Sequence, residues 1–199
     1  MKKFELTTNS KMHLGKKLFQ IKALISFGNV EEGELGGFIE KEDNLSQYGN
    51  AWVSGDARVY GNAEVSGDAE VYGDARVYGD AEVSGNAWVS GDAEVSGDAR
   101  VSGDAEVSGN AWVYGNAWVS GDARVSGDED YTTIKGFGRS CRNTTFFRTK
   151  DDNVKVACGC FSCTLDEFRA EVKKTHGDSK YAKEYLMIAD LMEMHFKED

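Results

Sequence analysis

The sequence predicts an all-β solenoid, a parallel β-helix, that carries a small α+β cap at its C-terminal end. Two observations predict this fold. A six-residue unit repeats thirteen times between Gly49 and Ser126 without insertion or deletion. Each unit reads Gly, Asn or Asp, Ala, a variable residue, Val, and Ser or Tyr. A period this short is typical of parallel β-helices, in which each unit supplies one short strand and one corner.

The interior of the solenoid follows from the spacing of Ala and Val within each unit. The two residues lie two positions apart, from Ala51 and Val53 in the first unit to Ala123 and Val125 in the last. Side chains two apart on a strand point to the same side, and the residue between them points away. We therefore expect all the Ala/Val pairs to line one continuous apolar column.

The pattern V-S/Y-G-N/D-A-x resembles the hexapeptide repeat of left-handed parallel β-helix proteins. That resemblance implies left-handed winding, three units in each triangular coil and a homotrimer, and most members of this superfamily are acyltransferases. The wider layout resembles that of phage and prophage hexapeptide-repeat proteins, on the strength of residues 36–39 (GGFI), 145–147 (TFF) and 158–161 (CGCF). This second resemblance implies a phage-encoded protein that acts in the host cytoplasm.

The chain divides into three predicted parts. Residues 1–35 form an N-terminal β cap, residues 36–128 form the repeat solenoid, and residues 129–199 form the C-terminal α+β cap. Caps are expected because an open solenoid end exposes both its apolar interior and unpaired strand edges.

The flanking parts carry their own secondary-structure signals. Runs of β-branched and aromatic residues predict strands over residues 2–8, 18–27, 132–136, 144–149 and 154–161. Thr164 and Glu167 form a capping-box pattern at the start of a helix, and His176-Gly177 ends it. Ser179 begins a second helix.

Charge is distributed unevenly along the chain. The net charge of -11 comes almost wholly from residues 49–128, whereas residues 1–30 and 131–160 are rich in Lys and Arg. An acidic stem of this kind argues against DNA as a partner, because it repels the phosphate backbone. The sequence has neither an apolar run long enough to span a membrane nor a secretory start, so we expect a cytoplasmic protein.

The cationic ends point to a small anionic ligand. The segment 135–148 mixes glycine, arginine and aromatic residues. Glycine lets backbone amides approach an anion, arginine offers forked hydrogen bonds, and a ring can stack on a base. We expect non-catalytic capture of a nucleotide-type ligand, without a cofactor, by Arg139, Arg142, Arg148, Lys150, Lys16, Lys17 and Phe147. The alternative is a twisted strand pair whose arginines are merely solvated.

Aromatic residues on the outside of the solenoid predict an interface. With three units per coil, residues 18 apart stack on one another, and aromatic enrichment on a surface marks contact sites. We expect the trimer interface to contain Trp52, Trp88, Trp112, Trp118, Tyr60, Tyr78 and Tyr114. Two alternatives remain open. These rings cover corner backbone and tolerate water, or they dock another protein on a structural spacer.

Enzymatic activity is the remaining functional alternative. An acyltransferase of the superfamily needs a histidine base beside the coils. The three histidines, His13, His176 and His195, all lie outside the repeat. We therefore expect no catalysis, with an acyltransferase that takes its histidine from a neighbouring subunit as the alternative.

Two groups of residues are loose candidates for metal binding. Cys158, Cys160 and Cys163, with Cys141 or His176 as a fourth ligand, could bind zinc, although their spacing fits no standard zinc site and buried thiols explain it equally well. A corner stack of Asp56, Asp74 and Asp92 could capture calcium, but Asp is also common at such turns because it tolerates left-handed backbone. We expect no metal.

Overall fold

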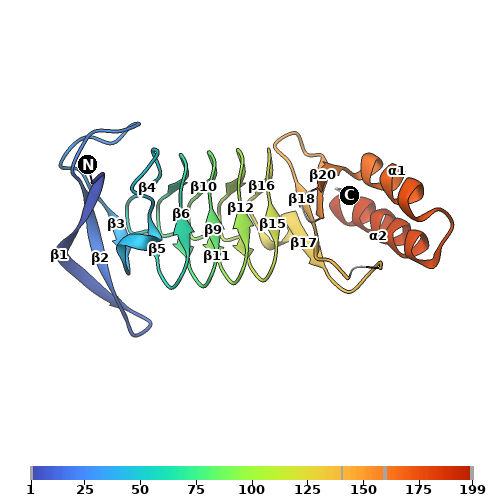
Figure 1. Cartoon of the computed structure of the whole chain (residues 1–199), viewed down its shortest axis with the longest axis horizontal. Helices are drawn as coiled ribbons and strands as arrows, with labels where there is room; N and C mark the ends of the chain where they lie inside the picture. Colours follow the sequence, from blue (N-terminus) through green and yellow to red (C-terminus); the bar gives the residue numbers. More distant parts are fainter. Residues whose placement is uncertain (1, 140, 159–160, 198–199) are drawn as a thin grey trace.

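A computed structural model describes residues 2–139, 141–158 and 161–197. The molecule is elongated, with a hairpin at one end, a regular stem and a sheet-and-helix cap at the other end (Figure 1). In the described part of the chain no helix is both long and apolar enough to cross a membrane.

The stem consists of thirteen two-residue strands, one in each repeat unit. They are β4 (Trp52–Val53), β5 (Arg58–Val59), β6 (Glu64–Val65), β7 (Glu70–Val71), β8 (Arg76–Val77), β9 (Glu82–Val83), β10 (Trp88–Val89), β11 (Glu94–Val95), β12 (Arg100–Val101), β13 (Glu106–Val107), β14 (Trp112–Val113), β15 (Trp118–Val119) and β16 (Arg124–Val125).

Each strand of the stem pairs with the strand three positions further along the chain, so that the strands form three parallel ladders. The three ladders run β4-β7-β10-β13-β16, β5-β8-β11-β14 and β6-β9-β12-β15. Trp88, for example, pairs with Glu70 on one side and Glu106 on the other, a spacing of eighteen residues. The predicted parallel β-solenoid with three units per coil is therefore confirmed, while its left-handed sense stays a prediction.

The Ala/Val column is the core of the stem. Every Ala and Val of the thirteen repeat pairs is between 0% and 1% exposed. The predicted apolar interior is confirmed. Residues between Ala and Val point outward, so the repeat fixes the interior and leaves the outer faces free to vary.

The corners of the coils depend on the Gly and Asn/Asp positions of the repeat. Gly85 has a φ of 70°, and a Cβ there would lie 2.8 Å from the backbone N of Gly103. Only glycine tolerates both the left-handed backbone and this close stacking. Where Asn and Asp stack, the amide donates to the carboxylate, as from Asn50 Nδ2 to Asp68 Oδ1 at 2.7 Å.

The two ends of the stem expose opposite backbone groups. Backbone N–H groups of each coil donate to carbonyls of the following coil, as from Trp88 to Ala105 at 2.8 Å. The first coil is therefore left with unpaired carbonyls and the last coil with unpaired N–H groups, and both must be satisfied by other partners.

The N-terminal end supplies hydrogen-bond donors to the first coil. Lys3 Nζ donates to the carbonyl of Ala51 at 2.9 Å, and Asn44 Nδ2 donates to that of Ala63 at 2.8 Å. Here β1 (Phe4–His13), β2 (Lys16–Ala23) and β3 (Leu35–Ile39) extend one ladder of the stem, followed by the short 3-10 helix Glu42–Asn44. The two predicted N-terminal strands are confirmed as an antiparallel hairpin, in which β1 is longer and β2 is shorter than predicted.

The C-terminal end supplies acceptors to the last coil. The backbone N–H of Trp112 donates to Asp128 Oδ1 at 2.8 Å, and that of Trp118 donates to Thr145 Oγ1 at 3.0 Å. Asp128 begins a second 3-10 helix, Asp128–Asp130. Donors therefore cap one end of the stem and acceptors cap the other.

The C-terminal cap is a four-stranded antiparallel sheet covered by two helices. Its elements are β17 (Tyr131–Ile134), β18 (Thr144–Arg148), β19 (Val154–Cys158), β20 (Phe161–Thr164), α1 (Leu165–His176) and α2 (Lys180–Phe196). Three strands and both helices agree with the predictions in kind, and β20 is an additional strand that was not predicted. The Thr164/Glu167 capping box and the Ser179 N-cap are confirmed.

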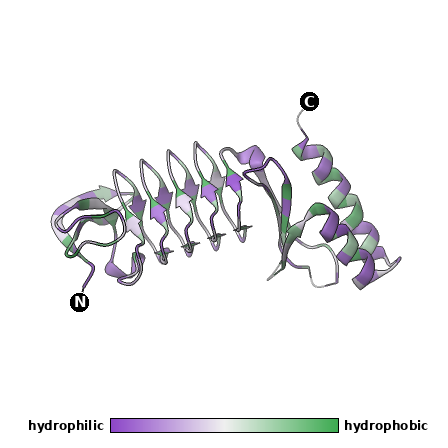
Figure 2. Ribbon diagram, turned by 90° about the horizontal axis from the view of Figure 1, so that it is seen from above, coloured by the Kyte–Doolittle hydropathy of each residue, from purple (hydrophilic) through white to green (hydrophobic). Residues whose placement is uncertain are grey.

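The sheet of the cap separates two apolar cores. Seen from above, it lies between the stem and the helices (Figure 2). Phe147 belongs to the core of the stem, whereas its neighbour Phe146 belongs to a second core with Phe168 and Ala189. This alternation anchors the cap on the last coil.

Candidate functional site

A cleft of about 370 Å³ lies within the C-terminal cap. It is bounded by Arg139 and Arg142, the adjoining ends of β19 and β20, and the facing sides of α1 and α2. Two of the predicted binding residues, Arg139 and Arg142, line it. The lining is completed by Cys158, Phe161, Phe168, Glu171, Val172, Thr175, His176 and Tyr185.

Aromatic rings form much of the cleft wall. Phe168 meets Tyr185 edge to face at 5.7 Å between ring centroids, and His176 stacks on Tyr185 at 5.9 Å. Phe161 is exposed at the rim. Such a wall offers flat apolar surface to a ring-bearing ligand.

The loop that carries Arg139 is docked on α2. Tyr185 Oη donates to the carbonyl of Phe137 at 3.2 Å, and the backbone N–H of Gly138 donates to Glu184 Oε2 at 3.3 Å. Burial raises the pKa of Tyr185, so its hydroxyl keeps the donated proton at neutral pH. These two bonds hold the backbone on either side of Gly138 at the edge of the cleft.

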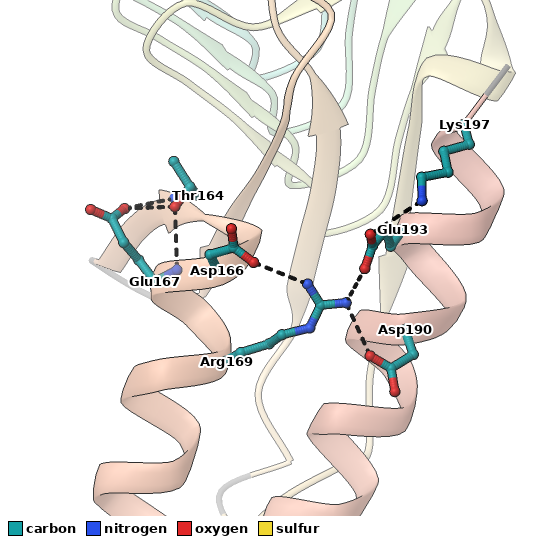
Figure 3. Close-up of polar contacts among 7 residues, drawn as sticks. All are labelled: Thr164, Asp166, Glu167, Arg169, Asp190, Glu193 and Lys197. Carbon is teal, nitrogen blue, oxygen red and sulfur yellow. Dashed lines mark hydrogen bonds and ion pairs between the residues drawn. The ribbon is translucent and has the colours of Figure 1, made fainter.

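The two helices are tied together by Arg169 (Figure 3). Its guanidinium bonds Asp166 on its own helix at 3.3 Å and Asp190 on α2 at 3.0 Å, and it also bonds Glu193. The capping box at Thr164 fixes the start of α1 next to this network. Because Phe168 adjoins Arg169 on α1, the network also positions the cleft wall.

The cleft presents positive charge that is not neutralised by a salt bridge. Within the described residues, neither Arg139 nor Arg142 lies in salt-bridge distance of a carboxylate. Glu171 at the rim pairs with Lys174 at 3.0 Å, and the lysine hydrogen bond lowers the pKa of Glu171. With respect to the carboxylates of the described residues, both guanidinium groups remain available to bind an anion.

The remaining predicted binding residues near the cap do not line this cleft. Arg148 pairs with Asp130 at 3.1 Å, and Lys150 pairs with Glu106 at 2.8 Å. The prediction that Phe147 stacks on a ligand ring is wrong, because its side chain is fully buried against the last coil. A strand residue that faces the stem cannot also reach the cleft on the helix side.

Lys16 and Lys17 lie on β2, in the cap at the opposite end of the stem (Figure 1). Lys16 pairs with Glu40 at 2.7 Å, and Lys17 Nζ lies 5.0 Å from the ring centroid of Phe19. Within one chain they do not share a site with Arg139 and Arg142.

The predicted interface residues divide into covered and exposed groups. Trp52 is only 4% exposed because the N-terminal cap covers it, with Phe27 meeting its ring edge to face at 5.4 Å. Tyr60 is buried between His13 and Tyr78, which stacks on it at 5.1 Å. The expectation that Trp52 and Tyr60 present open surface is therefore wrong.

Three of the predicted aromatic residues are open to solvent. Trp88 and Trp112 are each 46% exposed, and Tyr114 is exposed beside Trp112, with 5.0 Å between their ring centroids. Tyr78 and Trp118 are half-buried. The outer aromatic surface of the stem is thus smaller than the sequence predicts.

The cysteines do not form a recognisable metal site in the part of the chain that the structure describes. No group of three candidate ligands gathers there, and Cys160 lies outside the described residues. Cys163 is buried, and burial raises the pKa of its thiol to about 11, which disfavours the thiolate that zinc requires. Cys141 is exposed, and Cys158 accepts a hydrogen bond from Thr144 Oγ1 at 3.4 Å.

Comparison with known protein families gives a match within the stem. A family model described as YdcK Beta solenoid repeat matches residues 75–91 and 105–121. The stem is a repeat of the β-solenoid type. No curated protein matches the chain.

Proposed function

We propose that this chain is a non-catalytic binding protein that captures a small anionic, ring-bearing ligand of the nucleotide type in its C-terminal cleft. The observation that carries this proposal is a pair of arginines, Arg139 and Arg142, that form no salt bridge with the described residues and line the same cleft as several aromatic rings. Arginine next to aromatic rings favours a nucleotide-type ligand, because guanidinium groups bind phosphate and aromatic rings stack on bases.

The size of the cleft supports this ligand class. Ligand pockets commonly measure about 300 to 1,000 Å³. The volume of about 370 Å³ lies near the lower end of that range. A single nucleoside unit matches it better than a large cofactor.

The chemistry of the cleft favours capture over turnover. A cysteine nucleophile normally needs a histidine base within hydrogen-bond reach. Cys158 and His176 both line the cleft, yet among the described residues the thiol is bonded to Thr144 and the imidazole stacks on Tyr185. Among the described residues of the cleft, these two side chains are not arranged as an acid–base pair for a covalent step.

The biological setting of this proposal comes from the resemblance to phage hexapeptide-repeat proteins. In an infected cell, a cytoplasmic homotrimer with one cleft in each subunit would lower the free concentration of a nucleotide signal used in host defence. Capture needs no chemical step, because the affinity for the nucleotide and the number of protein copies in the cell together determine how much of the signal is bound.

Titration calorimetry with nucleoside mono-, di- and triphosphates and cyclic nucleotides tests the proposal. Arg139→Ala and Arg142→Ala should each weaken binding by about tenfold to a hundredfold, since a charge-assisted hydrogen bond contributes about 1.5–3 kcal/mol. Lys17→Ala is the matched control, because it removes a predicted binding cation from the other end of the molecule. Silence across the panel, or unchanged binding by the double arginine variant, would overturn the proposal.

A second candidate function is a stem that docks another protein. The exposed Trp88, Trp112 and Tyr114 support it, because large aromatic residues on a surface are typical of contact sites. A silent nucleotide panel together with co-purification that depends on Trp112 would favour this function.

A further inference from the structure

We infer that the ligand consists of two nucleoside units joined through a phosphate, because a second cavity opens beside the cleft and shares Arg142 with it. This inference rests on the proposed function. The second cavity measures about 500 Å³ and lies where the last coils meet the cap. Its lining includes Arg100 and Trp118 from the stem and Arg142 and Asn143 from the cap.

Among the residues that the structure describes, Arg142 is the one that lines both cavities. A guanidinium carries five N–H donors arranged as a planar fork, so one phosphate can be bound while groups on either side of it diverge. Within the described residues no carboxylate competes for Arg142. Its position between two cavities matches the position of a phosphodiester between two nucleosides.

The second cavity has its own stacking surface. Trp118 points outward from β15 and is half-buried, and its Nε1 lies 3.5 Å from Ser102 Oγ, which fixes the orientation of the indole. Base–aromatic stacking tolerates any base, because every base has a flat face. The first cavity provides Phe161, Phe168 and Tyr185 for the same purpose.

The polar groups of the second cavity are arranged to leave hydrogen-bonding capacity for a ligand. Asp98 Oδ2 accepts from Asn116 Nδ2 at 3.2 Å, so its charge is partly satisfied. Asn143 Nδ2 donates to the carbonyl of Asn116 at 2.7 Å, which fixes that amide and leaves its carbonyl oxygen as an acceptor. The ion pair of Arg100 with Glu82 is long, at 3.4 Å. These groups offer hydrogen-bond donors and acceptors to the sugar hydroxyls and base edge of a second nucleoside.

Matched pairs of a mononucleotide and the corresponding 5′-phosphorylated linear dinucleotide, one pair for each base, test this inference by calorimetry. The dinucleotide should bind about 5-fold to 150-fold more tightly than the mononucleotide, the gain expected from one additional stacked base. Trp118→Ala and Arg100→Ala should abolish most of this gain and leave mononucleotide affinity unchanged. Arg139→Ala should weaken both ligands by a similar factor.

Folding controls keep the test decisive. Trp118 packs partly against the core of the stem, so its replacement by alanine could disturb folding. Trp118→Phe keeps a stacking ring and should retain the higher affinity for the dinucleotide. Arg100→Ala probes the same cavity without altering this packing. Equal affinity for the two ligands, or a Trp118→Ala variant that weakens both equally, would overturn the two-unit ligand while leaving mononucleotide capture intact. Failure of both ligands to bind would overturn the proposed function along with it.

Discussion

Replacement of Gly138 by alanine should release the loop that carries Arg139 from α2. Gly138 has a φ of 67°, and a Cβ there would lie 2.2 Å from Tyr185 Oη. Left-handed backbone costs a non-glycine residue about 1–2 kcal/mol. Overpacking against a fixed side chain costs about 1–3 kcal/mol more. The free energy of opening this loop should therefore fall by about 2–5 kcal/mol.

Gly136→Ala is the matched control for this prediction. Gly136 also has a positive φ, 95°, but a Cβ there meets no atom within 4 Å. It should incur only the backbone cost, so the difference between the two variants isolates the contact with Tyr185.

Hydrogen exchange of peptides covering residues 135–143 measures this difference directly, without any ligand. Each 1.4 kcal/mol corresponds to about a tenfold change in an equilibrium constant. Gly138→Ala should therefore exchange about 5-fold to 150-fold faster than Gly136→Ala. Equal protection in the two variants would refute the conclusion that Tyr185 holds this loop. If nucleotides bind as proposed, Gly138→Ala should also bind them more weakly than Gly136→Ala.

Four further predictions concern the stem, its caps and its assembly. Val89→Ala should cost about 2 kcal/mol in urea unfolding, because it removes about two methylene equivalents of fully buried apolar volume and leaves a cavity; an unchanged midpoint would contradict a tightly packed column. Burial lowers the pKa of Lys3 from 10.5 to about 8, so the unfolded chain binds the extra proton and stability should rise between pH 8 and pH 10, a slope that Lys3→Met should remove. Burial raises the pKa values of Tyr60 and Tyr131 from 10.0 to about 12. Their contribution to stability is complete below pH 10 and is lost only above it, so these tyrosines do not alter the slope between pH 8 and pH 10. Thr164→Ala should cost about 1 kcal/mol through loss of the N-cap of α1, measured by thermal unfolding against Thr175→Ala, which lies at the opposite end of the same helix. Trp112→Ala should shift a trimer toward monomer in light scattering, whereas the covered Trp52 should matter only for stability; a monomeric parent protein would contradict self-association.

The stem could be predicted from the sequence because the interactions that determine its strands and turns involve residues close together in the chain. The placement of Ala51 and Val53 on one side of a strand depends only on their spacing, and the same spacing repeats in each coil. The Thr164 capping box and the Ser179 N-cap are equally local, since each bonds a backbone group within three residues. Such features need no knowledge of the tertiary structure.

The site was harder to predict because its composition depends on long-range contacts. Arg148 and Lys150 look like Arg139 and Arg142 in the sequence, but Asp130 and Glu106 approach them from other elements and neutralise them. Tyr185 could be assigned to a helix by periodicity, yet its contact with Phe137 spans 48 residues. The signal available in the sequence was Gly138, next to Arg139, because glycine allows a side chain from another element to pack closely against the backbone.

The polarity of the two stem ends has a consequence for assembly. Without its cap the first coil offers free carbonyl acceptors, and without its cap the last coil offers free N–H donors, at corresponding positions of the six-residue unit. These two surfaces are complementary, so bare stems would join head to tail and grow into a filament, because such a contact does not close on itself. Lys3, Asn44, Asp128 and Thr145 therefore act as terminators of polymerisation, and the length of the rod is set by where the chain places them.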